Sequence, residues 1–286
     1  MKTPTVLASF SQEGTPEGCT IHKFTVRSPC MDREIKAAVV LPPEYGDHAD
    51  KDYPILYTLH GMAAPYDTFS AMAPLRKALG EKPMIVTCFD GDIASAYLDS
   101  PYRQKWSRDT DDTTLVKSFF TTFFLEEFIP SIDKNYRVNS SQRMLTGFSM
   151  GGFGAFHYML TKPNQFISVS SLSGWFESLT SLPEDRQQWV QGLLGPYPGN
   201  EGRYGDVDLY TRVKKQREGG LKLPPIYLHC GTEDFLLEAN RKMHAFLNEQ
   251  GIACEYKESP GSHDWPFWRD ASAGIVDFHW RVLQEK

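Results

Sequence analysis

The chain has 286 residues, of which 41% are hydrophobic and 23% are charged, and its formal net charge is −6. This composition is ordinary for a globular protein with a large core, and the length suits one α/β domain covering residues 1–286. Because no cluster of Lys or Arg offsets the negative charge, we expect neither a nucleic acid nor an anionic membrane as a partner.

Long apolar segments are lacking in the sequence. No run reaches the ~18 residues of a membrane span, and the start, MKTPTVLASFSQEG, has an apolar stretch shorter than a signal-peptide core of ~7–15 residues. The protein is therefore predicted to be cytoplasmic, or secreted with a signal peptide that this sequence does not contain. The 5 cysteines are scattered and predict neither a disulfide framework nor a zinc site; they are Cys19, Cys30, Cys88, Cys230 and Cys254.

Short apolar runs predict strands along most of the chain. The runs are rich in β-branched and aromatic residues without strict alternation, which is typical of strands buried on both faces of a sheet. They span residues 35–41, 55–59, 84–89, 143–146, 166–172, 225–230 and 253–259.

Apolar residues at helical spacing lie between these runs and predict helices. The predicted helices span residues 67–78, 114–132, 152–160, 237–249 and 271–284. Strands that alternate with helices indicate βαβ units, so the predicted class is α/β with a mostly parallel central sheet and helices on both faces. Two long polar stretches interrupt this alternation, at residues 91–112 and 174–220.

The segment LTGFSMGGFGA, residues 145–155, contains the motif G-x-S-x-G from Gly147 to Gly151. A strand is predicted before the motif and a helix after it, which is the setting that exposes a nucleophilic serine. The flanking glycines tolerate a tight turn and close packing of the helix. Ser149 is therefore predicted to be a catalytic nucleophile.

A serine hydroxyl is a poor nucleophile unless a base accepts its proton, so a histidine and an orienting acid are expected downstream. In α/β-hydrolases these groups follow in the order Ser, then Asp or Glu, then His. Asp234 follows a predicted strand, and His263 lies in a Gly- and Ser-containing loop after the last strand, so this order is met. Glu233 and Asp264 are rival candidates for the acid.

The oxyanion of a tetrahedral intermediate needs two donors. One is the backbone N–H of the residue after the nucleophile, Met150. The second is expected from the loop after an early strand, where the sequence has His60-Gly61-Met62. The amides of this turn are therefore candidates for the second donor.

Six ordered stretches together resemble the putative-esterase family of α/β-hydrolases; they are YPILYTLHGM, EEFIPSIDKNYRV, GFSMGGFGA, VSSLSGWF, HCGTEDF and SHDWPFW. This family includes feruloyl, acetyl-xylan and tributyrin esterases, S-formylglutathione hydrolases and mycolyltransferases. The resemblance covers residues 20–268 and implies Ser149, Asp234 and His263 as the catalytic triad. It also implies the amides of Met62 and Met150 as the oxyanion hole.

The function implied is that of a serine carboxylesterase that hydrolyses acetyl, butyryl or feruloyl-type esters through an acyl-enzyme. Phe153 stands where S-formylglutathione hydrolases usually carry a histidine, and HDWPFW is closer to the feruloyl and tributyrin esterase branch. The alternatives are a hydrolase of thioesters such as S-formylglutathione, an acyltransferase, and a catalytically silent carbohydrate-binding module. The expected partner is a small-molecule or carbohydrate-linked ester, and the sequence does not determine the oligomeric state.

No metal or organic cofactor is expected, because the triad chemistry needs none. The Asp90-Gly91-Asp92 stretch is interpreted as a solvated turn rather than as a calcium site.

Aromatic residues predicted near the carboxyl end of the sheet are candidates for the substrate pocket, since open α/β folds bind their ligands there. The insertion at residues 174–220 is predicted to lie near the active site. Bulky rings would favour acetyl, butyryl or a flat aromatic acyl group over long chains. Phe267 and Trp268 are assigned to the core. The substrate-binding candidates are Tyr97, Trp106, Trp175 and Trp265.

Overall fold

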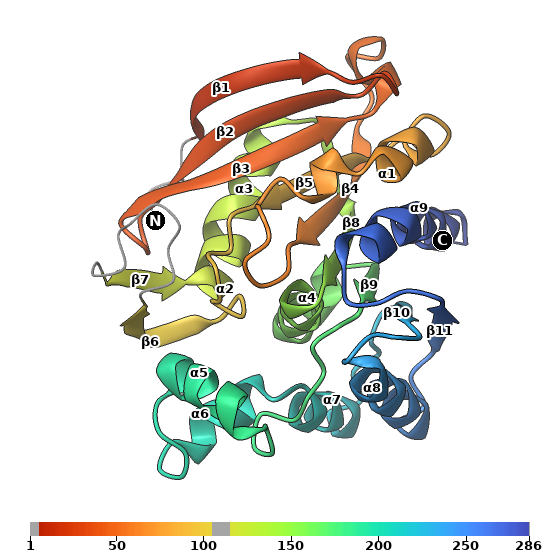
Figure 1. Cartoon of the computed structure of the whole chain (residues 1–286). Helices are drawn as coiled ribbons and strands as arrows, with labels where there is room; N and C mark the ends of the chain where they lie inside the picture. Colours follow the sequence, from red (N-terminus) through yellow and green to blue (C-terminus); the bar gives the residue numbers. More distant parts are fainter. Residues whose placement is uncertain (1–5, 105–114, 286) are drawn as a thin grey trace.

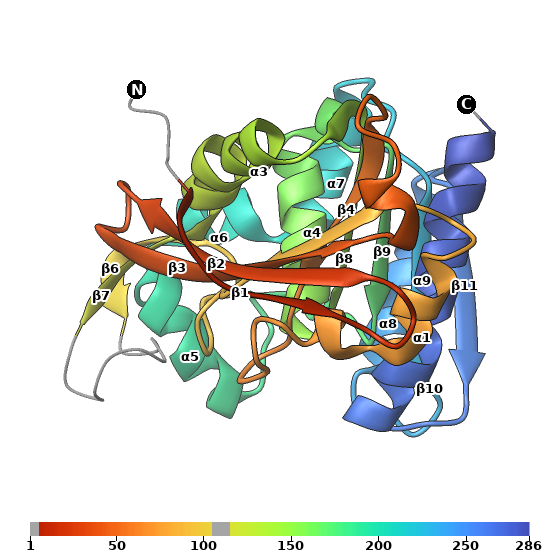
Figure 2. The same cartoon turned by 90° about the horizontal axis from the view of Figure 1, so that it is seen from above.

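A nine-stranded sheet forms the centre of the molecule, and a separate hairpin lies beside it (Figures 1 and 2). The computed structural model describes residues 6–104 and 115–285. The strands are β1 (Val6–Gly14), β2 (Thr20–Ser28), β3 (Arg33–Leu41), β4 (Tyr53–Leu59), β5 (Ile85–Phe89), β6 (Asp99–Gln104), β7 (Val116–Phe119), β8 (Val138–Phe148), β9 (Ser168–Leu172), β10 (Ile226–Gly231) and β11 (Cys254–Ser259).

The order of strands in the main sheet is β1-β2-β3-β5-β4-β8-β9-β10-β11. From β5 to β11 every neighbouring pair is parallel, whereas β1, β2 and β3 form an antiparallel edge. The predicted class, α/β with a mostly parallel central sheet, is therefore confirmed. Strands β6 and β7 pair with each other as the separate hairpin.

Helices cover both faces of the sheet. They are α1 (Ala73–Ala78), α2 (Phe120–Thr122), α3 (Ile129–Asn135), α4 (Met150–Thr161), α5 (Glu184–Leu194), α6 (Glu201–Val207), α7 (Leu209–Glu218), α8 (Leu237–Glu249) and α9 (Trp265–Gln284), with a π-helical turn at Phe123–Phe128 and short 3-10 turns at Pro43–Gly46, Phe69–Ala71 and Pro163–Gln165. Helices α1 and α9 pack together on one face. The phenylalanines of the π turn, α4 and α8 contribute to the core on the other face.

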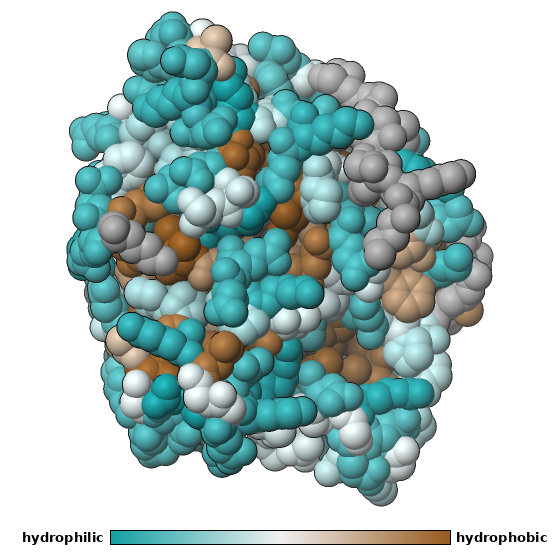
Figure 3. Space-filling model, turned by 180° about the vertical axis from the view of Figure 1, so that it is seen from behind, coloured by the Kyte–Doolittle hydropathy of each residue, from teal (hydrophilic) through white to brown (hydrophobic). Residues whose placement is uncertain are grey.

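The surface of the molecule is mostly hydrophilic on the face seen from behind (Figure 3). On the face shown in Figure 3, apolar side chains form small patches between hydrophilic ones. Among the described residues, no helix combines the length and the apolar character needed to cross a membrane.

Strands β1 and β2 are absent from the predicted elements, whereas β3 corresponds to the predicted strand at residues 35–41. The sequence of β2, TIHKFTVRS, mixes charged and apolar residues, and buried positions such as Phe24 and Val26 lie among partly exposed ones. Such a mixture lacks the continuous apolar run that marks a strand buried on both faces. A search for continuous apolar runs, which identifies the parallel strands, therefore does not find β2.

Four of the five predicted helices begin at other residues: α1 begins at Ala73 after the 3-10 turn Phe69–Ala71, α4 begins at Met150, and the other two differ as follows. The predicted helix 114–132 begins too early, because Val116–Phe119 is strand β7 and helical structure starts at Phe120. Helix α9 begins at Trp265 instead of residue 271. Asp264 caps it, since its carboxylate accepts the Phe267 amide, and a proline in the first turn fits a helix start.

The predicted insertion at residues 174–220 contains α5, α6 and α7 (Figure 1). Helix α5 packs on β6, and α7 packs on α4. Buried Val190 of α5 and Val213 of α7 belong to the same core cluster as the buried side chains of α4. These helices therefore extend the main core towards the carboxyl edge of the sheet.

The turn between β8 and α4 holds Ser149 in a strained conformation, with φ of 54° and ψ of −121°. Its neighbours leave no room for side chains. A Cβ atom added to Gly151 would lie 2.0 Å from the carbonyl oxygen of Leu59, and one added to Gly147 would lie 2.2 Å from the carbonyl oxygen of Gly151. The glycines are therefore needed because backbone segments touch at this turn.

Gly151→Ala is expected to lower the free energy of unfolding by at least ~2 kcal/mol, because the methyl group would overlap the backbone of β4. Gly205→Ala is a matched control, since a Cβ there meets nothing within 4 Å. Within helix α6 the control change is expected to be neutral or to stabilise by up to ~1 kcal/mol. Urea unfolding of both variants measures this, and equal stabilities would contradict the close contact at the turn.

Candidate active site

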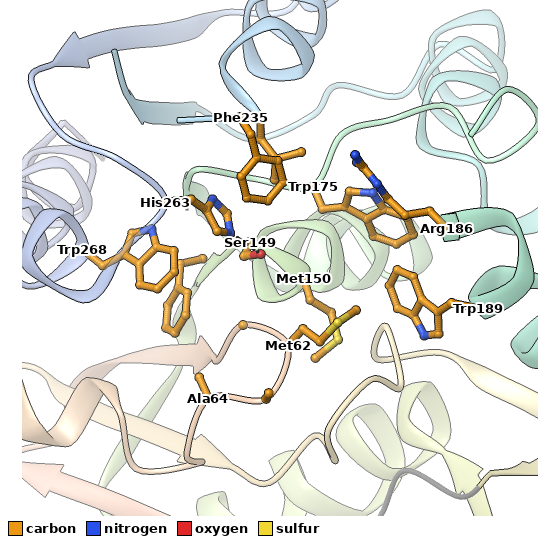
Figure 4. A pocket seen from close by; sticks show the side chains of 14 residues that line it. Met62, Ala64, Ser149, Met150, Trp175, Arg186, Trp189, Phe235, His263 and Trp268 are labelled. Atoms are coloured by element: carbon orange, nitrogen blue, oxygen red, sulfur yellow. Dashed lines mark hydrogen bonds between the residues drawn. The ribbon is translucent and has the colours of Figure 1, made fainter. Parts of the chain in front are cut away.

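Three side chains predicted as a catalytic triad form a continuous chain of hydrogen bonds. His263 Nε2 lies 2.9 Å from Ser149 Oγ. Figure 4 shows the two side chains next to each other. The two carboxylate oxygens of Asp234 lie 3.0 and 2.9 Å from His263 Nδ1. Ser149 follows β8, Asp234 follows β10 and His263 follows β11. Parallel strands bring these loops together because their carboxyl ends lie at one edge of the sheet.

Asp234 is buried and negatively charged. Burial acts to raise its pKa, but hydrogen bonds from His263 and from the amide of Leu236, which lies at 2.8 Å, outweigh it. The pKa of Asp234 is therefore held below its ordinary value. The carboxylate stays ionised at neutral pH, and it can keep a proton on Nδ1 of His263 so that Nε2 is free to accept one from Ser149.

The rival acids have other partners. Exposed Glu233 accepts a hydrogen bond from the amide of Gly261, and Asp264 accepts one from Phe267 at the start of α9. Both carboxylates therefore stabilise the ends of the loop that carries His263. In the described part of the chain, neither carboxylate forms a hydrogen bond to the His263 ring.

The residues predicted to supply the oxyanion hole lie beside Ser149. Met62 and Met150 both line the cavity that contains Ser149 (Figure 4). Met150 is the first residue of α4, so its N–H has no partner within the helix. The N-terminus of a helix favours negative charge, which suits an anion that develops next to Ser149.

The loop that carries Met62 is fixed by His60. The Nδ1–H of His60 donates to the carbonyl of Gly61 at 2.8 Å, and its Nε2 accepts the amide of Gly91 at 2.9 Å. The hydroxyl of Tyr97 donates to the carbonyl of His60 at 2.9 Å. Tyr97 is 0% exposed and does not line the cavity, so its prediction as a substrate-binding residue is wrong. Its ring instead supports this loop from the core.

The Asp90-Gly91-Asp92 stretch is not a solvated turn. Asp90 and Asp92 are both buried, and Arg33 binds both carboxylate oxygens of Asp92, at 2.9 and 2.5 Å. The amide of Asp92 donates to Asp90. Because the amide of Gly91 donates to His60, the ion pair between Arg33 and Asp92 stabilises the loop next to Ser149.

A cavity of about 690 Å³ opens at Ser149. Its walls are mostly apolar, and Figure 4 shows them from close by. It is lined by Gly61, Met62, Ala63, Ala64, Phe148, Ser149, Met150, Trp175, Arg186, Trp189, Phe235, Leu236, His263 and Trp268.

Of the remaining residues predicted to bind substrate, Trp175 lines the cavity and Trp265 does not. Trp175 lines the cavity, and its backbone N–H donates to the carbonyl of Ser149 at 3.0 Å. Trp265 is 39% exposed and does not line the cavity, so it is corrected to a surface residue at the start of α9. Trp106 lies outside the described residues.

Trp268, assigned to the core from the sequence, is a wall of the cavity. Its ring stacks on Phe148 with centroids 4.4 Å apart and meets the His263 ring edge-on at 4.9 Å. The early start of α9 turns this residue towards the site. The aspartate and proline at that helix start are the signal that could have placed it.

Three further lining residues were not expected from the sequence. Phe235 is 67% exposed and packs on His263, with centroids 4.4 Å apart. Arg186 and Trp189 lie one turn apart on α5, so both point to the same side. Figure 4 shows them with Trp175 on the side of Ser149 opposite Trp268.

Known proteins with similar sequences and folds include several esterases. An acetyl esterase of Caldicellulosiruptor saccharolyticus is 26% identical over 235 residues, which cover 79% of this chain and 83% of that protein. Esterase Rv1288 of Mycobacterium tuberculosis is 31% identical over 248 residues, but the match spans only 51% of that longer protein. An S-formylglutathione hydrolase from Agrobacterium tumefaciens shares the fold, with a TM-score of 0.81, 19% identity and coverage of 97% of this chain and 100% of that one.

A model of a protein family matches most of the chain. Residues 28–278 match the Esterase family, described as putative esterase. This range contains Ser149, Asp234 and His263. The resemblance noted in the sequence is thereby confirmed, and family and relatives together support hydrolysis of an ester. The chain belongs to the putative-esterase family of α/β-hydrolases.

Proposed function

We propose that the protein is a serine carboxylesterase that hydrolyses short-chain or aromatic acyl esters through an acyl-enzyme on Ser149. The hydrogen-bond chain from Ser149 through His263 to Asp234, open to an apolar cavity, carries this proposal. A nucleophile, a base and an orienting acid in contact are the set that acyl transfer requires. The substrate is a small-molecule or carbohydrate-linked ester.

In the first step His263 accepts the proton of Ser149 while Oγ attacks the ester carbonyl. The amides of Met62 and Met150 donate to the oxyanion, and each donor is worth ~3–4 kcal/mol when well aligned. Asp234 stabilises the imidazolium. His263 then gives its proton to the leaving alcohol, and water repeats the sequence to release the acid.

The position of His263 distinguishes the two sides of the cavity. Because His263 must reach the leaving oxygen, the alcohol lies on its side of Ser149, along Trp268. The acyl group then extends to the opposite side, towards Trp175 and Trp189 (Figure 4).

The acyl side has a rigid aromatic wall. The rings of Trp175 and Trp189 pack with centroids 4.6 Å apart, and Trp189 Nε1 donates to the carbonyl of Ala94 at 2.8 Å. Fixed rings of this size limit the length of a chain and offer flat surfaces to an aromatic or short acyl group.

Ser149→Ala and His263→Ala are each expected to lower kcat by about 10⁶-fold, because each removes a partner of the proton transfer. Asp234→Asn is expected to cost about 10⁴-fold, since an amide would hold the imidazole in the wrong tautomer. Initial rates with 4-nitrophenyl acetate measure these losses, and the double variants should lose no more than the single ones.

Glu233→Gln is the matched control for the acid, because it removes the neighbouring carboxylate, which does not bond to His263. Its activity is expected to stay within about tenfold of the wild type. A loss at Glu233 as large as at Asp234, or near-normal activity of Asp234→Asn, would show that the acid is wrongly assigned.

The acyl wall predicts a limit on chain length. In kcat/KM, the wild type is expected to favour 4-nitrophenyl acetate or butyrate over laurate by at least about tenfold, or ~1.4 kcal/mol in the transition state. Trp175→Ala should narrow this difference because it opens the wall. Trp265→Ala removes an exposed indole outside the cavity and should leave the ratio unchanged. A wild type that prefers laurate would rule out this wall as the limit.

A further inference from the structure

The acyl side of the cavity contains one permanent positive charge. Of the residues that line the cavity in the described part of the chain, only Arg186 and His263 have side chains that can be charged. Arg186 lies on α5, on the same side of Ser149 as Trp175 and Trp189 (Figure 4). Binding of an alkyl or aryl group does not need a guanidinium among the indole and phenyl rings. The presence of Arg186 in this wall therefore indicates a further role in binding.

Glu177 orients this guanidinium from behind the wall. One carboxylate oxygen, Oε2, accepts hydrogen bonds from Nη1 of Arg186 and from the indole Nε1 of Trp175, the latter at 2.8 Å. Glu177 does not line the cavity. The guanidinium carbon also lies 5.9 Å from the ring centroid of Phe235. Arg186 is thus held at the wall by a carboxylate on one side and an aromatic ring on another.

Some donors of Arg186 have no hydrogen-bond partner among residues 6–104 and 115–285. A guanidinium has donors on Nε, Nη1 and Nη2, and among the described residues the hydrogen-bonded atom is Nη1. The side chain is 31% exposed and that of Glu177 22% exposed. The bond to Glu177 therefore orients the guanidinium while leaving part of its planar fork available to a ligand in the cavity.

We propose that Arg186 binds a carboxylate at the far end of the acyl group, so that the enzyme prefers monoesters of flat dicarboxylic acids. This inference rests on the proposed serine esterase function, which fixes the acyl group on this side of Ser149. The flat part of such a substrate lies along Trp175 and Trp189, and its second carboxylate reaches the free edge of the guanidinium. A cavity of about 690 Å³ has room for more than an acetyl or butyryl group.

Matched esters with one leaving group test this recognition. The anionic substrates are 4-nitrophenyl 4-carboxybenzoate and 4-nitrophenyl 4-carboxycinnamate, which place the carboxylate at two distances from the ester. Their neutral partners carry a methyl group instead of the carboxylate. The measured quantity is the ratio of kcat/KM for the anionic ester to that for its neutral partner, at low ionic strength.

Arg186→Gln is expected to lower this ratio at least about tenfold for one of the two lengths, since hydrogen bonds to charged groups are the strong ones. Glu177→Gln should shift the ratio upwards, because it removes the charge that partly neutralises Arg186 but keeps an oxygen for Trp175. Arg241→Gln removes an exposed arginine of α8, paired with Glu238 and Glu258, and should leave the ratio unchanged.

Opposite shifts in the two variants support recognition of charge. If Arg186 only stabilised the wall, both changes would loosen the wall and would move the ratio in the same direction, and this result would overturn the inference.

An unchanged ratio in Arg186→Gln at both lengths would also overturn the inference. Turnover of the neutral esters by the wild type would then still support the esterase function. If the wild type hydrolysed none of the esters, the proposed function and this inference would fail together. Arg186→Met, which also removes the charge and is expected to lower the ratio in the same way, replaces Arg186→Gln if the latter does not fold.

Discussion

The close approach of backbone segments at the turn of Ser149 is the constraint on which the site depends. Strand β8 ends and α4 begins at this residue, and the start of α4 lies against the end of β4 at Gly151. The amide of Ser149 donates to the carbonyl of Leu172, at the end of β9, at 3.0 Å. The turn is therefore tied to both neighbouring strands, which can hold the unfavourable φ of Ser149 and expose its hydroxyl.

The same turn sets the position of the substrate walls. The carbonyl of Ser149 accepts a hydrogen bond from the amide of Trp175, so the cavity wall that we assign to the acyl group begins one hydrogen bond away from Ser149. Trp175 in turn shares the carboxylate of Glu177 with Arg186. Hydrogen bonds through Trp175 and Glu177 thereby connect Arg186 of α5 to Ser149. An ester hydrolase can change specificity through such an added segment while the sheet edge keeps the catalytic groups in place.

Residues of the site that lie directly after a predicted strand could be located from the sequence. Ser149 and Asp234 could be located because each directly follows an apolar run that forms a parallel strand. Trp268 packs against the core as predicted, but its place in the cavity wall could not be predicted, since it depends on where α9 begins and the predicted start lay six residues too late. Tyr97 and Arg186 depend on contacts between distant segments, which neither composition nor periodicity specifies. Strands β1 and β2 of the antiparallel edge were missed because polar and charged residues interrupt their apolar runs.

Covalent labelling by an alkyl fluorophosphonate tests the central claim most directly, because the reagent reacts with a serine only when a base activates it. Mass spectrometry of the intact chain should show the gain of one phosphonyl group, and peptide mapping should place it on Ser149. His263→Ala should label far more slowly under the same conditions. A label on another residue, or equally fast labelling of Ser149 without His263, would contradict the account of an activated nucleophile at this turn.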